Sequence, residues 1–371
     1  MAGQGSQHAK RRFGLSGGSA CVCCLPRRSL LTGFVATAAS ATLPAIPAIA
    51  QTPAAKQAPA KPAVSAGRID VHRHFVPPGH VVDPKRNYLN VRSTIPKQLE
   101  DMDNSGVALS VMSLSAAALS HPDARDARKF SRAVNEYAAT LTRDHPGRFG
   151  QFAYLPFPDI EGSLKEIEYA LDTLKADGIY LMTNYGDKFL GDPVFAPLFE
   201  ELNRRRAVVY THPTSHPCCE QLVPGLRDAD IEYGTNTTRA IAKYVFSGFS
   251  RRYPDVRMIW SHAGGTMPFL IRRFDKRVKE SPEFQPILPE GFTPEARKFY
   301  YDIAQAPERA PMAALRGVAP VSQMLFGTDW PHLTTEEHVV GLKDCGVFDA
   351  AELKAIDRDN ALRLMPTLRT V

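Results

Sequence analysis

A short apolar run followed by a helical pattern recurs eight times between residue 68 and the end of the chain. Each run is rich in β-branched or aromatic residues and has the length of a strand. A strand followed by a helix, repeated eight times in about 300 residues, is typical of a (β/α)8 TIM-like barrel. An open, doubly wound sheet is the alternative, although no glycine-rich nucleotide loop follows the first run. The eight predicted strands are 68–75, 107–114, 149–155, 178–184, 207–212, 257–262, 299–304 and 323–329.

The segments between these runs carry recognisable helix signals. Asp192-Pro193 supplies an N-cap and a first-turn proline, and apolar residues follow at the spacing of one helix face. Pro96 opens another helix, which we expect to end near Gly106. The longest connection, residues 213–256, should contain a helix over 237–249, and we expect it to serve as a lid or a subunit contact.

The positive charge of the chain is concentrated at its beginning. The 371 residues include 45 Lys or Arg and 39 Asp or Glu, a formal net charge of +6. Residues 1–50 hold five of the basic residues and no acidic one, which leaves 40 basic against 39 acidic residues in the rest. A nucleic-acid-binding protein carries its excess charge on the folded surface. We therefore exclude nucleic acid as a partner.

The first 50 residues have the three parts of an export signal in the usual order. Arg27-Arg28 is followed by a short apolar stretch to Leu43, and then by Ala48-Ile49-Ala50. The paired arginines are typical of a twin-arginine signal, which is recognised as an address. The apolar stretch is shorter than the roughly 20 residues that span a bilayer.

This pattern predicts three parts in the chain. Residues 1–50 form a signal peptide of the twin-arginine type, 51–67 an Ala/Pro-rich linker, and 68–371 the barrel. We expect an exported protein, periplasmic or secreted, that contacts the twin-arginine translocon transiently. No stable membrane anchor is expected.

Six cysteines are distributed unevenly along the chain. Three fall within the predicted signal peptide, and Cys218, Cys219 and Cys345 remain after its removal. An odd number with two adjacent members does not form a disulfide framework. We expect Cys218 and Cys219 to be free thiols, with a bridge between them as the alternative in an oxidising compartment.

Histidines and one aspartate stand at the ends of several predicted strands. His72 and His74 end the first run, and their spacing of two places both side chains on one face, the lumen of a barrel. His212 ends the fifth run, His262 the sixth and Asp329 the eighth. Because the carboxyl ends of barrel strands carry the chemistry of this fold, we expect these five residues to converge there.

Such a set suits one divalent ion, zinc or manganese, with a position left open for water or substrate. A single strand-end histidine is more often structural, but five ligand-type residues at one end of a barrel outweigh that interpretation. His332 follows Asp329 by three residues and could also line the site. We expect the histidines that do not end strands to lie in solvent or in local caps: His80, His121, His145, His216, His332 and His338.

Four motifs resemble the amidohydrolase superfamily. They are 68–74 (RIDVHRH), 211–213 (THP), 261–265 (SHAGG) and 327–331 (GTDWP), in that order along the chain. They are similar to the aminocarboxymuconate-semialdehyde decarboxylase branch, which includes γ-resorcylate and 6-methylsalicylate decarboxylases. The stretch 191–213 looks closest to the 6-methylsalicylate members. The resemblance extends from residue 68 to about residue 366.

This resemblance implies roles for the strand-end residues. It makes His72, His74, His212 and Asp329 the metal ligands and His262 the catalytic histidine beside the metal. Hydrolytic relatives often bridge two metals with a carboxylated lysine at the end of the fourth strand. Residues 178–184 contain no lysine, so we expect a single metal ion.

The resemblance further implies a metal-dependent non-oxidative decarboxylase, a carbon–carbon lyase, acting on a small aromatic or enol-like carboxylic acid. His262 or Asp329 would deliver the proton that replaces the carboxyl group. Arg92 and Arg239 are candidates for binding the substrate carboxylate, because a guanidinium matches that anion geometrically. Members of the branch assemble as dimers or tetramers, so we expect a homo-oligomer.

Two other functions fit the same residues. One is a single-metal hydrolase of an amide, ester or lactone, in which His262 would help to deprotonate a metal-bound water. The other is an exported metal-binding protein without catalysis. The sequence disfavours the second, because His262 and Asp329 exceed what metal storage requires.

Overall fold

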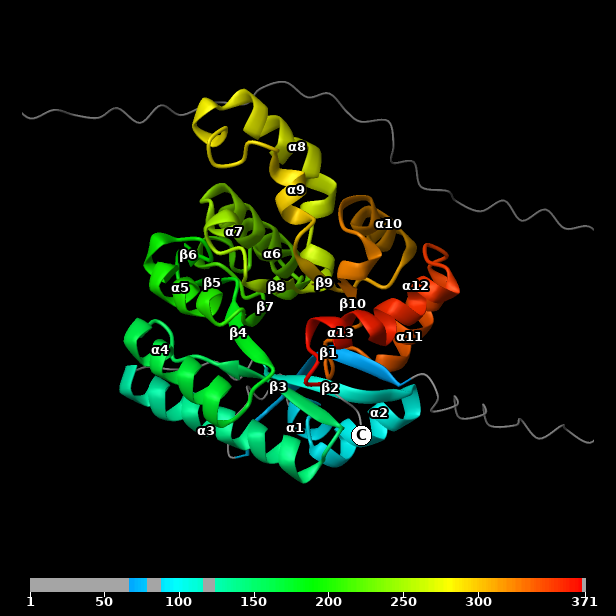
Figure 1. Ribbon diagram of the computed structural model, residues 1–371. Helices are drawn as coiled ribbons and strands as arrows, with labels where there is room; N and C mark the ends of the chain where they lie inside the picture. The colour runs from blue at the N-terminus through cyan, green and yellow to red at the C-terminus, as the bar shows by residue number, and fades with distance from the viewer. Residues whose placement is uncertain (1–66, 79–87, 116–123, 369–371) are drawn as a thin grey trace, which may run out of the picture. The chain divides into compact units, whose positions relative to one another are not determined.

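The computed structural model describes residues 67–78, 88–115 and 124–368 (Figure 1). Eight parallel strands form one sheet in the order β1-β2-β3-β4-β7-β8-β9-β10. All eight predicted runs contain one of these strands; β1 and β2 match their runs, and the other six strands are shorter than theirs. The strands are β1 Arg68–Phe75, β2 Val107–Leu114, β3 Phe149–Tyr154, β4 Gly178–Met182, β7 Val208–His212, β8 Arg257–Trp260, β9 Tyr300–Asp302 and β10 Met324–Leu325.

The first strand also pairs with the segment at and beyond β10. The amide of Val71 donates to the carbonyl of Phe326 at 3.0 Å, and that of His74 to the carbonyl of Trp330 at 2.8 Å. Arg73 and Trp330 form a parallel bridge. The sheet therefore curves until its first and last strands meet, which confirms the predicted (β/α)8 TIM-like barrel over the open-sheet alternative.

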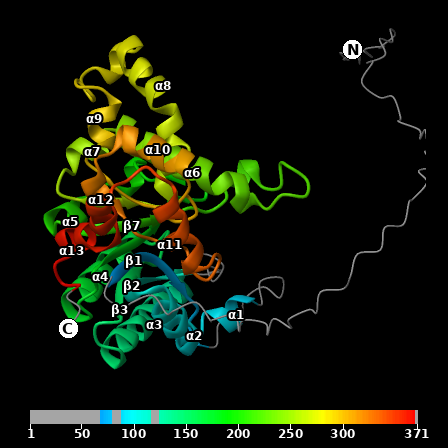
Figure 2. The ribbon, with the colours of Figure 1, turned by 90° about the vertical axis from the view of Figure 1, so that its right-hand side faces the viewer.

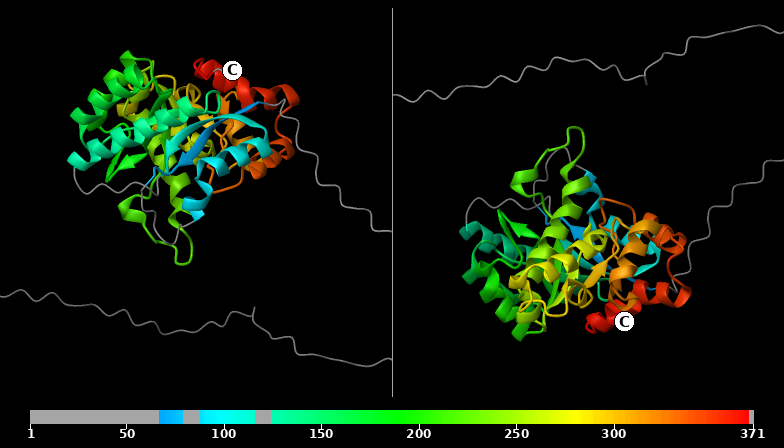
Figure 3. Two further views of the ribbon diagram at one scale, coloured as in Figure 1. Left: turned by 90° about the horizontal axis from the view of Figure 1, so that it is seen from below. Right: turned by 90° about the horizontal axis from the view of Figure 1, so that it is seen from above.

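Helices lie outside the strands, as the two views of Figure 3 show. No helix in the described part of the chain is both long and apolar enough to cross a bilayer. The hairpin strands β5 Asn184–Tyr185 and β6 Lys188–Phe189 follow β4. The α-helices are α1 Tyr88–Arg92, α2 Ile95–Ser105, α3 Ala124–Asp144, α4 Ile160–Glu168, α5 Ala196–Arg204, α6 Asp228–Phe246, α7 Phe249–Arg252, α8 Met267–Glu280, α9 Phe292–Ala296, α10 Arg309–Val318, α11 Thr335–Asp344, α12 Ala350–Lys354 and α13 Asn360–Leu364.

The predicted helix signals act where the sequence places them. α2 has its proline in the first turn and ends at Gly106, whose φ of 68° lies in the left-handed region that ends many helices. The Asp192 side chain accepts from the amide of Val194 at 3.1 Å and caps a 3-10 turn that leads into α5. These local interactions fix where two helices that cover the barrel begin or end.

The helix in the long connection differs from the prediction. α6 begins at Asp228 rather than at residue 237, and it ends at Phe246 before the separate helix α7. The carboxylate of Asp230 accepts from the backbone amide of Arg227 at 3.1 Å at its start. Gly248, with φ of 79°, separates the two helices. Figure 2 shows the segment before α6 and the first turns of α6 projecting away from the strands.

Stacked aromatic rings fill the barrel beneath the histidines. The ring of Tyr210 stacks on Phe152 at 5.0 Å and on Tyr180 at 5.9 Å, between centroids. The same ring meets the edge of His72 at 5.2 Å. All of these side chains are buried. The lumen is therefore a packed core that closes the metal centre from below, as in other barrels of this kind.

Candidate metal centre

The predicted ligand atoms converge on one point at the carboxyl ends of β1, β7 and β10. Asp329 Oδ1 lies 2.9 Å from His74 Nε2, 3.2 Å from His72 Nε2 and 3.9 Å from His212 Nε2. His72 Nε2 and His74 Nε2 are 3.2 Å apart. Ligands about 2.0–2.1 Å from a tetrahedral zinc ion are roughly 3.4 Å from one another. Asp329 Oδ1, His72 Nε2 and His74 Nε2 are therefore spaced as ligands of one ion, and His212 Nε2 lies somewhat farther from Oδ1.

The other nitrogen of each imidazole is held by an oxygen. His72 Nδ1 lies 2.9 Å from Asp302 Oδ2, and His212 Nδ1 lies 2.8 Å from the carbonyl oxygen of Pro213. His74 Nδ1 lies 3.0 Å from Ser113 Oγ. The carboxylate and the carbonyl can only accept, so Nδ1 carries a proton in His72 and His212. All three rings are thereby oriented with Nε2 toward the centre, as in protein metal sites.

Within the described part of the chain, two buried atoms of the predicted ligand set lack a hydrogen bond. They are Asp329 Oδ1 and His212 Nε2, although other polar atoms lie close to both. A buried acceptor without a donor is costly. A cation placed among these atoms would satisfy both of them. The donor set of imidazole nitrogens and one carboxylate oxygen is the chemistry that zinc and manganese accept.

The charges of the four residues differ. Burial lowers the pKa of both His74 and His212 to about 4, so these rings are neutral at pH 7. Burial opposes the charge of His72 as well, but Asp302 and Asp329 outweigh it and raise its pKa to about 10. Burial alone would raise the pKa of Asp329, yet the neighbouring histidines, His72 first, hold it well below its usual range. Without metal, His72 is thus a cation between two carboxylates.

His262 contacts the other oxygen of Asp329. Its Nε2 lies 3.3 Å from Asp329 Oδ2, and its Nδ1 has no hydrogen-bond partner among the described residues. Its backbone amide donates to Asp302 Oδ1 at 3.0 Å. One ligand atom each from His72, His212, His262 and Asp329 lies within 4.8 Å of the others. His262 therefore belongs to the group of residues that could hold an ion, and it faces the oxygen of Asp329 that the three other histidines do not surround.

Two glycines of the motifs make room for this arrangement. A Cβ on Gly327 would lie 2.9 Å from the Cβ of His72 and 3.0 Å from that of Asp302. A Cβ on Gly265 would lie 2.0 Å from the carbonyl oxygen of Gly234 in α6. The first glycine lets two strand-end side chains pack side by side. The second lets α6 lie against the loop that carries His262.

Backbone strain gathers at the same end of the barrel. His262, Ala263, Gln305 and Asp329 have φ between 54° and 58°, although none is glycine. Such residues cost about 1–3 kcal/mol each and occur often at functional sites. Asp302 offsets part of this cost, because its Oδ1 accepts from the amides of His262 and Ala304 at 3.0 and 2.9 Å.

Four residues that support the centre are not among those predicted from the sequence. Asp302 ends the seventh strand, so the strand-end rule that found the histidines also applies to it. Ser113 and Gln305 gave no signal. His338 was expected in solvent or in a local cap; the structure instead buries it completely, with hydrogen bonds to Gln305 and Thr334.

The other histidines occupy the positions expected, with one addition. His216 caps a short turn by accepting from the amide of Cys218 at 3.1 Å, and His145 packs against Phe149. His332 forms a second group with His74 and Asp329, whose ligand atoms lie within 4.8 Å of one another. His332 therefore lines the site. His80 and His121 lie outside the described residues.

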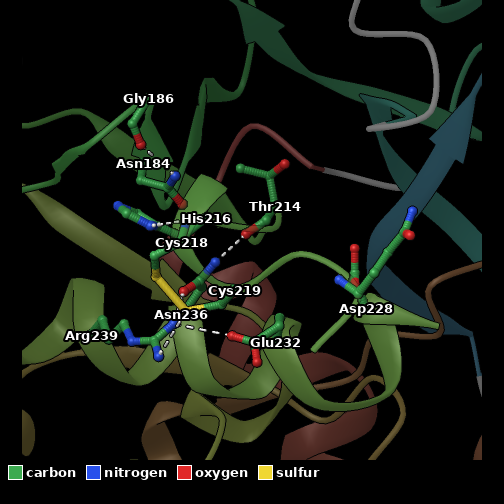
Figure 4. Close-up of a disulfide and its surroundings, with 11 residues drawn as sticks. Asn184, Gly186, Thr214, His216, Cys218, Cys219, Asp228, Glu232, Asn236 and Arg239 are labelled. Atoms are coloured by element: carbon green, nitrogen blue, oxygen red, sulfur yellow. Dashed lines mark hydrogen bonds and ion pairs between the residues drawn. A yellow bond between two sulfur atoms is a disulfide. The ribbon is translucent and has the colours of Figure 1, made fainter. Parts of the chain in front are cut away.

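The two candidate arginines have different surroundings. Arg92, exposed on α1, donates to the carbonyl of Pro331 at 3.3 Å, two residues beyond Asp329. Arg239 on α6 donates to Asn236 at 2.6 Å and to Glu232 at 3.1 Å (Figure 4). Arg92 thus lies beside the loop that carries Asp329, whereas the guanidinium of Arg239 is engaged within the long connection.

The sulfurs of Cys218 and Cys219 are bonded to each other (Figure 4). The expectation of two free thiols is therefore wrong, and the alternative of a bridge holds. Both cysteines lie in the short turn Pro217–Cys219, which brings the adjacent side chains together. Cys345 is a free, buried thiol.

The family model described as Amidohydrolase matches residues 69–367. The chain is 37% identical to the decarboxylase yanB of Aspergillus niger, over 81% of this chain and 87% of the relative. It is 34% identical to the 6-methylsalicylic acid decarboxylase of Penicillium expansum, over 82% of this chain and 98% of the relative.

Solved structures share the fold at lower identity. A 2,6-dihydroxybenzoate decarboxylase complexed with 2,6-dihydroxybenzoate is 22% identical with a TM-score of 0.73, covering 81% of this chain and 99% of that one. A dihydroxybenzoic acid decarboxylase of Polaromonas sp. JS666, with bound manganese and 2-nitroresorcinol, is 21% identical with a TM-score of 0.69. It covers 82% of this chain and 98% of its own.

Proposed function

The chain belongs to the amidohydrolase family, and from this premise we propose that it is a metal-dependent, non-oxidative decarboxylase of a small aromatic carboxylic acid. The observation that carries the proposal is the position of Asp329. Three imidazole Nε2 atoms surround its Oδ1, and His262 faces its Oδ2. Relatives that match most of the chain are named decarboxylases, which favours a carboxy-lyase over the hydrolase alternative.

We propose one divalent ion held by His72, His74, His212 and Asp329. When bound, the ion supplies Lewis-acid polarisation to a coordinated oxygen of the substrate. Zinc is the first candidate, because three imidazoles and one carboxylate match its preferences. Manganese is the second, since the same ligand types suit it and a structural relative contains it.

The reaction requires a proton at the carbon that loses the carboxyl group. The bond from that carbon to the carboxylate breaks, carbon dioxide leaves, and the electron pair left on the carbon takes the proton. The histidines around Asp329 hold its pKa well below the usual range, so its carboxylate is an acceptor at neutral pH. We therefore assign proton delivery to His262, whose Nε2 lies 3.3 Å from Asp329 Oδ2.

For substrate binding we favour Arg92 over Arg239. Arg92 is exposed beside the loop of Asp329, and its guanidinium can meet an anion at the mouth of the site. Arg239 would first have to leave Glu232, to which its guanidinium is paired. The relatives' names indicate hydroxybenzoates such as 6-methylsalicylic acid as the first compounds to test.

The proposal is tested with purified protein that is stripped of metal and reloaded with zinc or manganese. Gas release is then measured over a panel of hydroxybenzoates. We expect carbon dioxide only from the reloaded protein. Release of alcohol or amine products from esters, lactones or amides, without carbon dioxide from any acid, would replace the lyase with the hydrolase.

We also propose that residues 1–50 direct export to the periplasm or the medium through transient contact with the twin-arginine translocon, followed by a linker to residue 67. The support is the order of signal elements in the sequence, which lies outside the described residues. Replacing Arg27 and Arg28 by lysine should leave the protein in the cytoplasm. Unchanged export of that variant would reject the twin-arginine route.

We further propose a homo-oligomer, a dimer or a tetramer. Four exposed apolar side chains on and before the start of α6 support it: Leu222, Val223, Leu226 and Ile231. Light scattering should show a mass above that of one chain, and Leu222→Asp with Leu226→Asp should lower it. A monomeric wild-type protein would reject this proposal.

A further inference from the structure

Gln305 and His338 form a chain of hydrogen bonds that ends on Asp329. The side-chain amide of Gln305 donates to Asp329 Oδ2, the oxygen that His262 also contacts. The backbone amide of Gln305 donates to His338 Nε2 at 2.9 Å. His338 Nδ1 lies 2.9 Å from the carbonyl oxygen of Thr334, the last residue before α11. Two separate parts of the chain are thereby linked to the metal centre.

The protonation pattern of this chain follows from the groups themselves. The carbonyl of Thr334 can only accept, so His338 Nδ1 carries the proton. The backbone amide of Gln305 can only donate, so His338 Nε2 is the acceptor. Burial lowers the pKa of His338, which favours the same neutral ring. His338 is completely buried, and its replacement by an apolar residue would leave the Gln305 amide without this acceptor.

The hydrogen bond from Gln305 to Asp329 satisfies a buried group at Asp329, whereas at Gln305 water could take its place. Gln305 is exposed and lines a surface cavity of about 590 Å³, so water could satisfy its amide. Asp329 is only 2% exposed and depends on protein groups. Gln305 nevertheless adopts a φ of 54°, which is unfavourable for a residue with a side chain. That conformation, fixed by His338, places the amide against Asp329 Oδ2.

We infer that Gln305 is a positioning residue for the Asp329 carboxylate, and that His338 fixes Gln305 in the conformation this requires. The terminal torsion of an aspartate is broad, so the carboxylate plane is set by its partners. With a donor on Oδ2, Oδ1 stays directed at the Nε2 atoms of His72, His74 and His212. Oδ2 stays an acceptor beside His262. The inference rests on the proposed function for its effect on catalysis, but not for its effect on metal binding.

The first test replaces the amide by a side chain of similar length, Gln305→Met, with Gln323→Met as the matched control. Gln323 directly precedes β10, whereas Asp329 follows that strand. The Gln323 side chain donates to the carbonyl of Lys298 at 3.3 Å. We measure the midpoint of thermal unfolding, the zinc affinity by competition with a coloured chelator, and kcat and KM for the hydroxybenzoate that the wild type turns over best. Q305M should unfold at the wild-type temperature but bind zinc about 10–100-fold more weakly.

With saturating zinc, kcat of Q305M should fall by a similar factor while KM changes less than about threefold. Q323M should match the wild type in zinc affinity and kcat. The inference would be overturned if Q305M kept the wild-type zinc affinity and kcat. It would also be overturned if zinc affinity and kcat fell only together with the unfolding temperature. If the wild type releases no carbon dioxide but Q305M still weakens zinc binding, the proposed function fails and the inference stands.

The second test concerns His338. His338→Leu removes the acceptor of the Gln305 amide, whereas His338→Gln keeps an acceptor and a donor in one side chain. H338L should weaken zinc binding as Q305M does, and H338Q should recover at least part of that loss. Equal zinc affinity in H338L and the wild type would overturn the part assigned to His338.

Discussion

At the scale of single residues, the carboxylate of Asp302 connects His72 with His262, the proposed proton donor. Its Oδ2 holds the ring of His72, and its Oδ1 accepts from the backbone of His262. Strand-end placement and the period of two were enough to predict that the five residues would converge. These two rules did not reveal Gln305 or His338. The contacts of Gln305 depend on its unusual backbone conformation and on His338, which comes from the later helix α11.

Asp302→Asn should bind metal about 10–100-fold more weakly than the wild type, because the ring of His72 loses its carboxylate partner. Chelator competition on the folded protein measures this loss. Asp177→Asn is the matched control: Asp177 is a half-buried carboxylate that accepts from the amide of Gln151 at 2.9 Å at the start of β4. Equal metal affinity in D302N and the wild type would contradict the role of Asp302.

Metal binding near pH 7 should release about one proton. His72, with a pKa of about 10 in the metal-free protein, is protonated and must lose that proton to bind through Nε2. His74 and His212, with pKa values of about 4, have none to lose. Metal affinity should therefore rise with pH up to about 10. Calorimetry in two buffers of different ionisation enthalpy counts the protons, and a count near zero would refute this charge assignment.

His262→Asn should lower kcat by about 10²–10⁴-fold through loss of the proton donor. The variant should retain close to one metal ion per chain, because His262 faces the outer oxygen of Asp329. Elemental analysis and steady-state kinetics on the same sample separate the two effects. Loss of the metal together with activity would make His262 a ligand instead.

At the scale of elements, Arg73 connects β1 to the helices beside it. The side chain alternates with His72 and His74, points away from the metal centre, and is completely buried. It donates to Gln98 at 2.6 Å and Asp101 at 2.6 Å from α2, and to Thr335 at 3.1 Å from α11. Its guanidinium also lies 4.9 Å from the ring of Trp330.

Arg73→Met should destabilise the barrel by about 3–5 kcal/mol, because it leaves the carboxylates of Asp70 and Asp101 without their buried partner. Denaturant unfolding with metal present measures the change. Arg143→Met is a suitable control, since Arg143 is 70% exposed and, among the described residues, pairs with its neighbour Asp144 alone. A loss below about 1 kcal/mol in R73M would show that the buried network contributes little.

Elements were predictable where local signals decide them. The caps of α2 and α5 and the alternating strands could be read from the sequence, since the signals lie within a few residues. The start of α6 could not, because the polar residues after Asp228 show no apolar stripe and the helix start is held by the hydrogen bond from the Arg227 amide to Asp230. The sequence did not distinguish a disulfide between Cys218 and Cys219 from two free thiols, because adjacent cysteines can exist in either state.

At the scale of the whole molecule, the net charge of +6 is carried almost entirely by residues 1–50. The remaining chain is nearly balanced, so its net charge does not attract an acidic substrate. In the proposed function the binding of such a substrate depends on local groups, a metal ion and an arginine such as Arg92. The barrel brings together the proposed metal ligands from strands that are far apart in sequence.

The central claim is that the buried centre releases carbon dioxide and delivers a solvent-derived proton to the same carbon. Turnover of 6-methylsalicylic acid or another hydroxybenzoate in D₂O, with metal-loaded and metal-stripped protein, tests it most directly. We predict one carbon dioxide and one deuterium per product, at the carbon that held the carboxyl group, and only with metal. Solvent oxygen in the product, or equal turnover without metal, would contradict the account.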